Sequence, residues 1–177
     1  CVELAAHAVE LTVKDLLTDT EVFVHGSTIA TNAVLEGKVA KTGVLCTKGT
    51  KYTLWRGEGR RNNIFDFTEP ARAPLVAPRY CIELDERTNA QGEIIVNLDD
   101  NDVIRAIEQL KLAGCEAIAV ALLWSIRNAK HELRIKTLLS EHWPNATISL
   151  SSDIQPVLRE YTRTSCTVLN VMLKPIV

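Results

Sequence analysis

The residues best suited to chemistry lie at the start of the segment VHGSTIATNAVLEGK, residues 24–38. Gly26 lets the backbone turn tightly and approach a ligand closely. Ser27 or Thr28 can cap a following helix, where unpaired N–H groups and the helix dipole attract an anion. His25 can contact a phosphate or move a proton. The pattern predicts a seat for a phosphate or carboxylate. An ordinary strand–turn–helix joint would look the same, and the segment is neither a P-loop nor a GxGxxG fingerprint.

A second group of candidate residues lies in the polar loop GEGRRNN, residues 57–63. Guanidinium groups bind phosphates and carboxylates through two parallel hydrogen bonds. Arg60 or Arg61 could therefore hold an anionic substrate or an acyl-phosphate intermediate. The alternative is a solvated basic loop in which an arginine pairs with Glu58.

Charged residues also crowd the start of the last predicted helix, at REYTRT, residues 159–164. Arg159 and Arg163 share one face of such a helix. We expect one of two arrangements. A buried polar cluster could dock onto the HGST turn, where an arginine would stabilise phosphoryl-transfer charge. Alternatively, the arginines form a salt-bridge ladder along the helix with Glu160.

The pair His131–Glu132 and the residue Glu86 are predicted to have structural roles. His131 and Glu132 open a predicted helix but lack the second histidine that a zincin motif requires. Capping and docking are therefore favoured over metal binding, and no metal site is predicted. Glu86, in the motif DER, is expected to anchor a neighbouring element rather than to catalyse.

Composition and charge argue against several classes of protein. The 177 residues are 46% hydrophobic and 24% charged, which suits one compact domain over residues 1–177. A net charge of −2 and 5% aromatic residues give no basis for binding nucleic acid or an anionic membrane. No apolar run reaches membrane-spanning length. The five cysteines are scattered without a CxxC pair, which is typical of reduced thiols. We expect a soluble, cytoplasmic protein.

Hydrophobic periodicity predicts alternating helices and strands. In chain order we expect helix 1–17, strand 21–24, helix 28–36, strand 41–47, a turn or short helix near 50–56, a hairpin of 79–86 with 93–98, helix 99–113, strand 115–124, helix 128–141, strand 147–150 and helix 155–173. Strands separated by helices, with one inserted hairpin, make an α/β domain.

Five motifs occur in an order that points to a family. They are VHGSTIATNAVLEGKVAKTGVLCTKG, GEGRRNNIFDF, PLVAPRYCIELDERTNAQGEIIVNLD, AIAVALLWSIRNAKHE and SSDIQPVLREYTRTSCTVLNVMLKP. Together they resemble the hydantoinase A / 5-oxoprolinase family over roughly residues 20–177. The resemblance implies part of an actin-like, ribonuclease-H-fold ATPase domain with an inserted β-hairpin. It also implies ATP and Mg²⁺ as cofactors and a companion B-type subunit.

The resemblance also implies roles for individual residues and a reaction. It assigns catalysis to His25, Arg60 and Arg61. It assigns phosphate or substrate binding to Gly26, Ser27, Thr28, Asn32 and Arg163. The family uses ATP to hydrolyse a cyclic amide such as hydantoin or 5-oxoproline. In the acetophenone-carboxylase-like branch, which is the alternative here, it carboxylates a ketone.

Two features of the family are missing from this sequence. Family members begin with an Asp-x-Gly-Gly-Thr-x-Thr-Asp phosphate loop, and they continue for several hundred residues past the last helix. Neither feature occurs here. We therefore expect an incomplete part of a larger A-type subunit, inactive by itself, that works with the remaining segments of that subunit. A non-catalytic interaction domain stays open as a second reading.

Overall fold

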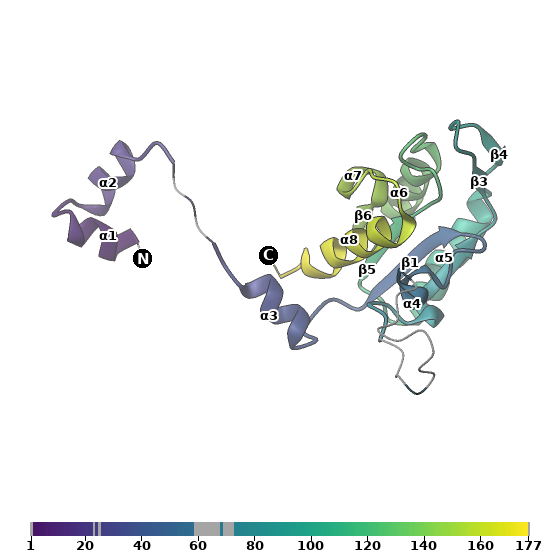
Figure 1. The fold of residues 1–177 in the computed structure, drawn as a ribbon, viewed down its shortest axis with the longest axis horizontal. Coiled ribbons are helices and arrows are strands. Elements are labelled where there is room, and N and C mark those ends of the chain that lie inside the picture. Colours follow the sequence, from purple (N-terminus) through teal and green to yellow (C-terminus); the bar gives the residue numbers. More distant parts are fainter. Residues whose placement is uncertain (1, 23, 25, 59–67, 69–72, 177) are drawn as a thin grey trace.

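A four-stranded parallel sheet forms the centre of the computed structural model, which describes residues 2–22, 24, 26–58, 68 and 73–176 (Figure 1). Its strand order is β2–β1–β5–β6, with bounds Cys81–Leu84, Thr42–Thr47, Ala117–Ala121 and Thr147–Leu150. Every neighbouring pair in this sheet is parallel. The carboxyl ends of the four strands therefore meet at one edge of the sheet.

Helices and a short hairpin make up the rest of the described chain. Their bounds are α1 Val2–Ala8, α2 Val13–Asp19, α3 Ile29–Leu35, α4 Thr53–Arg56, the 3₁₀ helix η1 Pro78–Tyr80, β3 Arg87–Thr88, β4 Ile94–Val96, α5 Asp100–Leu112, α6 Lys130–His142, α7 Ser151–Ile154 and α8 Glu160–Leu173. None of the helices in the described residues is long and apolar enough to cross a membrane. The α/β fold with an inserted hairpin, predicted from the sequence, is confirmed.

Helices cover both faces of the sheet. Successive residues of a strand point to opposite sides, and since the central strands carry apolar residues on both sides, each side needs a cover. On one face, α5 and α6 pack against Leu45 of β1 and Ile118 of β5. On the other face, α8 packs against Val44 and Ala119. The central strands are buried along their whole length, as parallel strands between two helical layers must be.

The predicted hairpin is wrong in one of its strands. Residues 81–84 form β2 and pair with β1 in the parallel sheet, whereas the hairpin joins β3 to β4. The side chains explain the difference. Cys81 is buried on the α8 face and Leu84 on the α5–α6 face. A strand that buries both faces belongs between helical layers rather than in an exposed hairpin.

The last predicted helix, expected over residues 155–173, begins only at Glu160, because residues 155–159 are not helical. α7 ends at Ile154 and α8 begins at Glu160. Pro156 lacks a backbone N–H and disfavours the helical conformation of the residue before it. Arg159 has a positive φ of 86°, which also lies outside the helical region. Residues 155–159 therefore separate the short helix α7 from α8, which packs on the sheet.

The N-terminal helices stand apart from the sheet (Figure 1). The predicted helix over residues 1–17 is wrong in its continuity, because Glu10 has a φ of 55° and Thr12 caps a new helix by accepting a hydrogen bond from the N–H of Asp15. The predicted strand at 21–24 is also not observed at its described residues. Glu21, Val22 and Val24 are exposed and unpaired, since a strand needs a neighbour to pair with.

Candidate functional site

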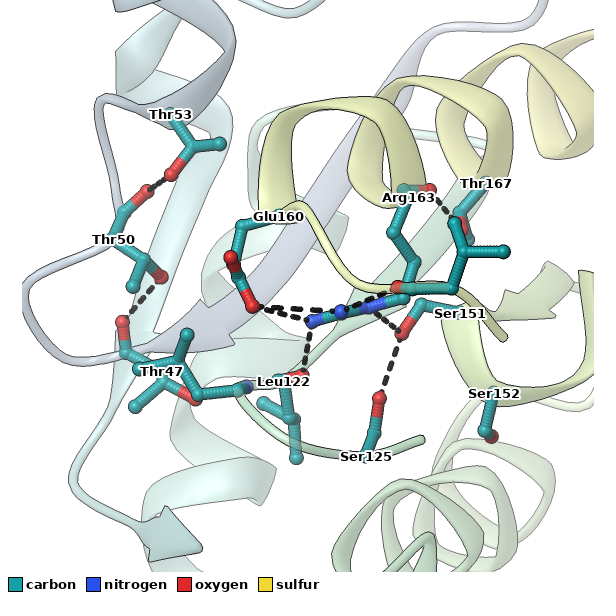
Figure 2. Close-up of polar contacts among 12 residues, drawn as sticks. Thr47, Thr50, Thr53, Leu122, Ser125, Ser151, Ser152, Glu160, Arg163 and Thr167 are labelled. Carbon is teal, nitrogen blue, oxygen red and sulfur yellow. Dashed lines mark hydrogen bonds and ion pairs between the residues drawn. The ribbon is translucent and has the colours of Figure 1, made fainter. Parts of the chain in front are cut away.

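Polar groups gather at the carboxyl edge of the parallel sheet, where ligands bind in many open α/β sheets. Thr47 ends β1, Leu122 directly follows β5, and Ser151 directly follows β6. Figure 2 shows these strand ends meeting beneath the first turns of α8. Side chains from α6 and α8 reach this edge and bind the strand ends together.

Glu132 is the acidic centre of this edge. It lies in the first turn of α6 and is 1% exposed. Its Oε1 accepts hydrogen bonds from the backbone N–H of Leu122, at 2.9 Å, and from the Ser151 hydroxyl, at 2.6 Å. Its Oε2 accepts from the N–H and the hydroxyl of Ser152, at 2.9 and 2.7 Å. The predicted docking role of Glu132 is confirmed, since one carboxylate ties the start of α6 to β5 and α7.

Arg163 is the basic centre of the same edge and is also 1% exposed. Its Nε donates to the Ser151 hydroxyl oxygen at 3.2 Å, and Nη2 donates to the Leu122 carbonyl at 2.9 Å (Figure 2). Nη1 donates to the Val157 carbonyl at 3.2 Å. Both terminal nitrogens also lie 3.5 Å from Oε1 of Glu160. Each nitrogen of this guanidinium group is therefore used inside the protein.

The Ser151 hydroxyl joins the two charged centres. Because its single hydrogen is donated to Glu132, its oxygen must accept from Arg163 and from Ser125, whose hydroxyl lies 3.0 Å away. The direction of every bond at this hydroxyl is thereby determined. The arrangement neutralises two buried charges without direct contact between them.

A second buried group joins β1 to α6. The Thr47 hydroxyl donates to Oε1 of Glu86 and accepts a hydrogen bond from the N–H of Leu123 at 2.9 Å. Oε2 of Glu86 lies 2.7 Å from Nδ1 of His131. Glu86 and His131 are both buried. The predicted anchoring role of Glu86 is confirmed, and the pair holds the ends of β1 and β5 against the start of α6.

A small cavity opens beside this edge, between β1, α4 and the start of α8. Its volume of about 10 Å³ is at the lower limit for a single water molecule. Its lining includes the thiols of Cys46 and Cys81 and the polar side chains of Thr50, Lys51, Thr53, Glu160 and Thr164. Burial raises the pKa of the Cys46 thiol to about 12 and that of Cys81 to about 11. Neither thiol is therefore a nucleophile at neutral pH.

The predicted HGST turn lies elsewhere, at the start of α3. Gly26, Ser27, Thr28 and Asn32 are all exposed. The Ser27 hydroxyl accepts from the N–H of Ile29 at 3.2 Å, and Asn32 Nδ2 donates to the Thr28 hydroxyl at 3.4 Å. The turn thus presents its hydroxyl and amide groups outward. Their predicted role in binding phosphate or substrate stays a prediction.

Four predicted site residues remain: three lie outside the described residues, and Arg163 lies in α8. His25, Arg60 and Arg61 lie outside the described residues. Arg163 is described, but the hypothesis that the start of α8 docks onto the HGST turn is wrong for this residue. The α3 segment meets the far end of α8, where the N–H of Ala40 donates to the carbonyl of Met172. Arg163 instead donates its hydrogen bonds to groups at the strand ends, such as the Leu122 carbonyl and the Ser151 hydroxyl. Phosphate binding by Arg163 stays a prediction, and it would require Arg163 to give up some of these bonds.

Sequence reasoning missed Ser151 and Thr47 as parts of this site. Each residue lies at the carboxyl end of a predicted strand, and this position is the signal that could have identified them. A metal centre is a different matter. Within the described residues, no three His, Cys, Asp or Glu side chains lie close enough together to hold an ion.

Comparison with known proteins gives the family. The family model described as the hydantoinase/oxoprolinase N-terminal region matches residues 3–143. The chain is 30% identical to the caprolactamase subunit alpha of Pseudomonas jessenii and 28% identical to the acetophenone carboxylase gamma subunit of Aromatoleum aromaticum. These matches cover 97% and 98% of this chain and 25% of each relative.

A solved structure agrees with this comparison. The crystal structure of the ATP-dependent caprolactamase from Pseudomonas jessenii superposes with a TM-score of 0.83 at 29% identity, over 99% of this chain and 26% of that one. The chain thus spans about a quarter of the length of these relatives. The motifs, the fold and the family match lead to one conclusion: this chain belongs to the hydantoinase/oxoprolinase family.

Proposed function

We propose that this chain is part of the ATP-dependent subunit of an enzyme that hydrolyses a cyclic amide such as hydantoin or 5-oxoproline. One observation carries the proposal: the chain matches the alpha subunit of a caprolactamase over 97% of its own length. Because that match covers 25% of the relative, we take residues 1–177 to be one α/β domain of a longer A-type subunit. By itself this domain would be inactive.

The chemistry of the proposal rests on phosphorylating a carbonyl oxygen. An amide is a poor electrophile, and transferring a phosphoryl group to its oxygen activates it. Positive charge and oriented N–H groups stabilise such a transfer, with Mg²⁺ neutralising the triphosphate. His25, Arg60 and Arg61 would act at the transferred group, while Gly26, Ser27, Thr28, Asn32 and Arg163 would contact phosphate or substrate. A B-type subunit would complete turnover. The free thiols of the described chain suit the cytoplasm, where ATP is available.

A second reaction is favoured by a specific observation. The match to the acetophenone carboxylase gamma subunit covers 98% of this chain, as completely as the caprolactamase match does. In that reading, ATP would phosphorylate an enol oxygen of a ketone before carboxylation. If the longer subunit has neither of these two activities, the domain is an interaction module of its complex.

The first test is a calorimetric titration of the 177-residue chain with Mg-ATP. We expect no heat, because the phosphate loop of the family is missing from this sequence. Binding that disappears in the Ser27→Ala/Thr28→Ala double variant would instead make the HGST turn a nucleotide site in its own right. Ser140→Ala, at an exposed serine of α6, is the matched control.

The second test uses the longer subunit together with its B-type partner. ATP hydrolysis is measured with hydantoin, 5-oxoproline or caprolactam, and separately with acetophenone plus bicarbonate. Stimulation by a cyclic amide supports the hydrolase proposal, and stimulation by the ketone supports the carboxylase alternative. If neither substrate stimulates hydrolysis, the interaction module is the remaining reading. Arg60→Ala and Arg61→Ala should abolish the stimulation, whereas Arg105→Ala on the exposed face of α5 should not.

A further inference from the structure

The N-terminal part of the chain exposes apolar side chains that a stable structure would cover. Leu4, Leu17, Val22 and Val24 are 75%, 51%, 74% and 86% exposed, and Val9 and Leu11 are also exposed. We call these six residues the arm surface. They come from α1, α2 and the segment that leads towards α3. Such a concentration of exposed apolar residues marks an interaction site.

The helices that carry this surface bury almost nothing themselves. Each has seven residues, and Ala6 is the one buried residue among them. Helices of this length are marginal in water unless an amphipathic face packs against something. In Figure 1, α1 and α2 lie apart from the sheet and its covering helices. Any partner that covers them must therefore lie outside the described chain.

The segment after α2 adds a second, independent indication. The sequence predicts a strand at residues 21–24, but Val22 and Val24 are exposed and belong to neither of the two sheets. Residues two apart in an extended segment share one face, so both valines would lie on the same side of a strand. Such an exposed segment can add as a strand to the edge of a sheet, where pockets beside that edge receive alternate side chains.

We propose that the arm surface docks onto a further part of the same polypeptide, with Val22 and Val24 adding a strand to the edge of a sheet there. The proposal rests on the proposed function in one respect, the existence of a longer subunit. The length of the relatives favours this occupant over a second copy. The caprolactamase chain that superposes on 99% of this chain is about four times as long. A longer chain can therefore supply the cover within one molecule.

The test separates the longer polypeptide into two co-expressed pieces, the 177-residue chain and the remainder. The wild-type pieces should purify together in equal amounts without nucleotide, and the backbone amides of Glu21, Val22 and Val24 should then exchange hydrogen slowly. In the chain alone these amides should exchange within seconds, while those of β1 and β5 stay protected. The Val22→Asp/Val24→Asp variant should weaken association at least about tenfold. Leu112→Asp, at a leucine of α5 that is 88% exposed, should not.

Several results would overturn the proposal. They are unchanged association of the double variant, arm amides that stay unprotected in the complex, and a mature gene product of only 177 residues. A dimer of the chain alone that protects the arm would show that a second copy is the occupant. Circular dichroism of the double variant shows whether the sheet domain remains folded. Since association is measured without ATP, a complex that forms but hydrolyses no ATP would refute the proposed function and leave this proposal standing.

Discussion

Arg163 and Glu132 are opposite charges on different helices, and both form hydrogen bonds with the Ser151 hydroxyl. The Ser151 hydroxyl donates to Glu132 at 2.6 Å and accepts from Arg163 at 3.2 Å. Both charged side chains are 1% exposed. Taking a charge out of water is costly unless hydrogen bonds replace the lost hydration. The strand ends supply those bonds, and the carboxyl edge of the sheet is held in one arrangement as a result.

Removing the shared hydroxyl should be costly. Ser151→Ala takes one donor from Glu132 and one acceptor from Arg163, and it leaves both groups buried. We expect the free energy of unfolding to fall by about 2 kcal/mol. Urea unfolding followed by circular dichroism measures the change. Ser140→Ala removes an exposed hydroxyl of α6 and should change stability by less than about 0.5 kcal/mol. Equal effects of the two substitutions would contradict this account.

Replacing Arg163 by lysine tests whether its role is structural. An ammonium group keeps the charge but cannot reach Ser151, Leu122 and Val157 with the geometry of a guanidinium group. We expect Arg163→Lys to lower the free energy of unfolding by about 3 kcal/mol in the absence of any ligand. Arg105→Lys, on the exposed face of α5, is the control. If Arg163→Lys were as stable as the wild-type chain, Arg163 would have no structural role and could act only in binding.

Gly43 shows how closely α5 packs on the sheet. A Cβ atom at this position would lie 2.7 and 2.8 Å from the two methyl carbons of Leu110 and 3.2 Å from Cδ1 of Ile118. Those side chains are fully buried and have little room to move. Gly43→Ala should therefore destabilise the domain by about 2 kcal/mol in thermal or urea unfolding. Gly26→Ala is the matched control, because nothing lies within 4 Å of the added carbon there.

The buried thiols should be unreactive. Burial raises the pKa of Cys46 to about 12 and that of Cys81 to about 11, so very little thiolate is present at pH 8. Alkylation by iodoacetamide at pH 8 should be at least about a hundredfold slower in the folded chain than in urea. Mass spectrometry of the digested protein measures both rates at each cysteine. If alkylation in the folded chain were slower than in urea by only about threefold or less, β1 and β2 would open readily.

The ion pair between α5 and α6 gives a pH dependence of known sign. Hydrogen bonding to Arg134 lowers the pKa of Asp100, with the two groups 2.5 Å apart. A lowered pKa contributes stability above the ordinary value of an aspartate, and this contribution is lost as pH falls through the lowered value. The difference in unfolding free energy between the wild type and Arg134→Gln should therefore shrink as pH falls from about 5 to about 2. Lys136→Gln, at an exposed position of α6, should show no such trend.

Local sequence determined the elements whose signals are short in range. The helix predicted from Asp99 appears as α5, with the Asp99 side chain accepting from the N–H of Asn101. The strand predicted at 147–150 appears with the same bounds as β6. In both cases a cap, a run of apolar residues or a turn residue lies within a few positions of the element that it defines. The order of the motifs likewise sufficed to indicate the family.

Tertiary structure decided the pairings between distant residues. Sequence alone did not show that β2 joins the parallel sheet, because its pairing with β1 depends on which faces the helices cover. Nor did it show that Arg163 reaches back to Leu122, which is 41 residues away. Periodicity reports whether a residue is buried but not which partner its polar atoms find. That choice is made when the strand ends meet at one edge and every buried donor must have an acceptor.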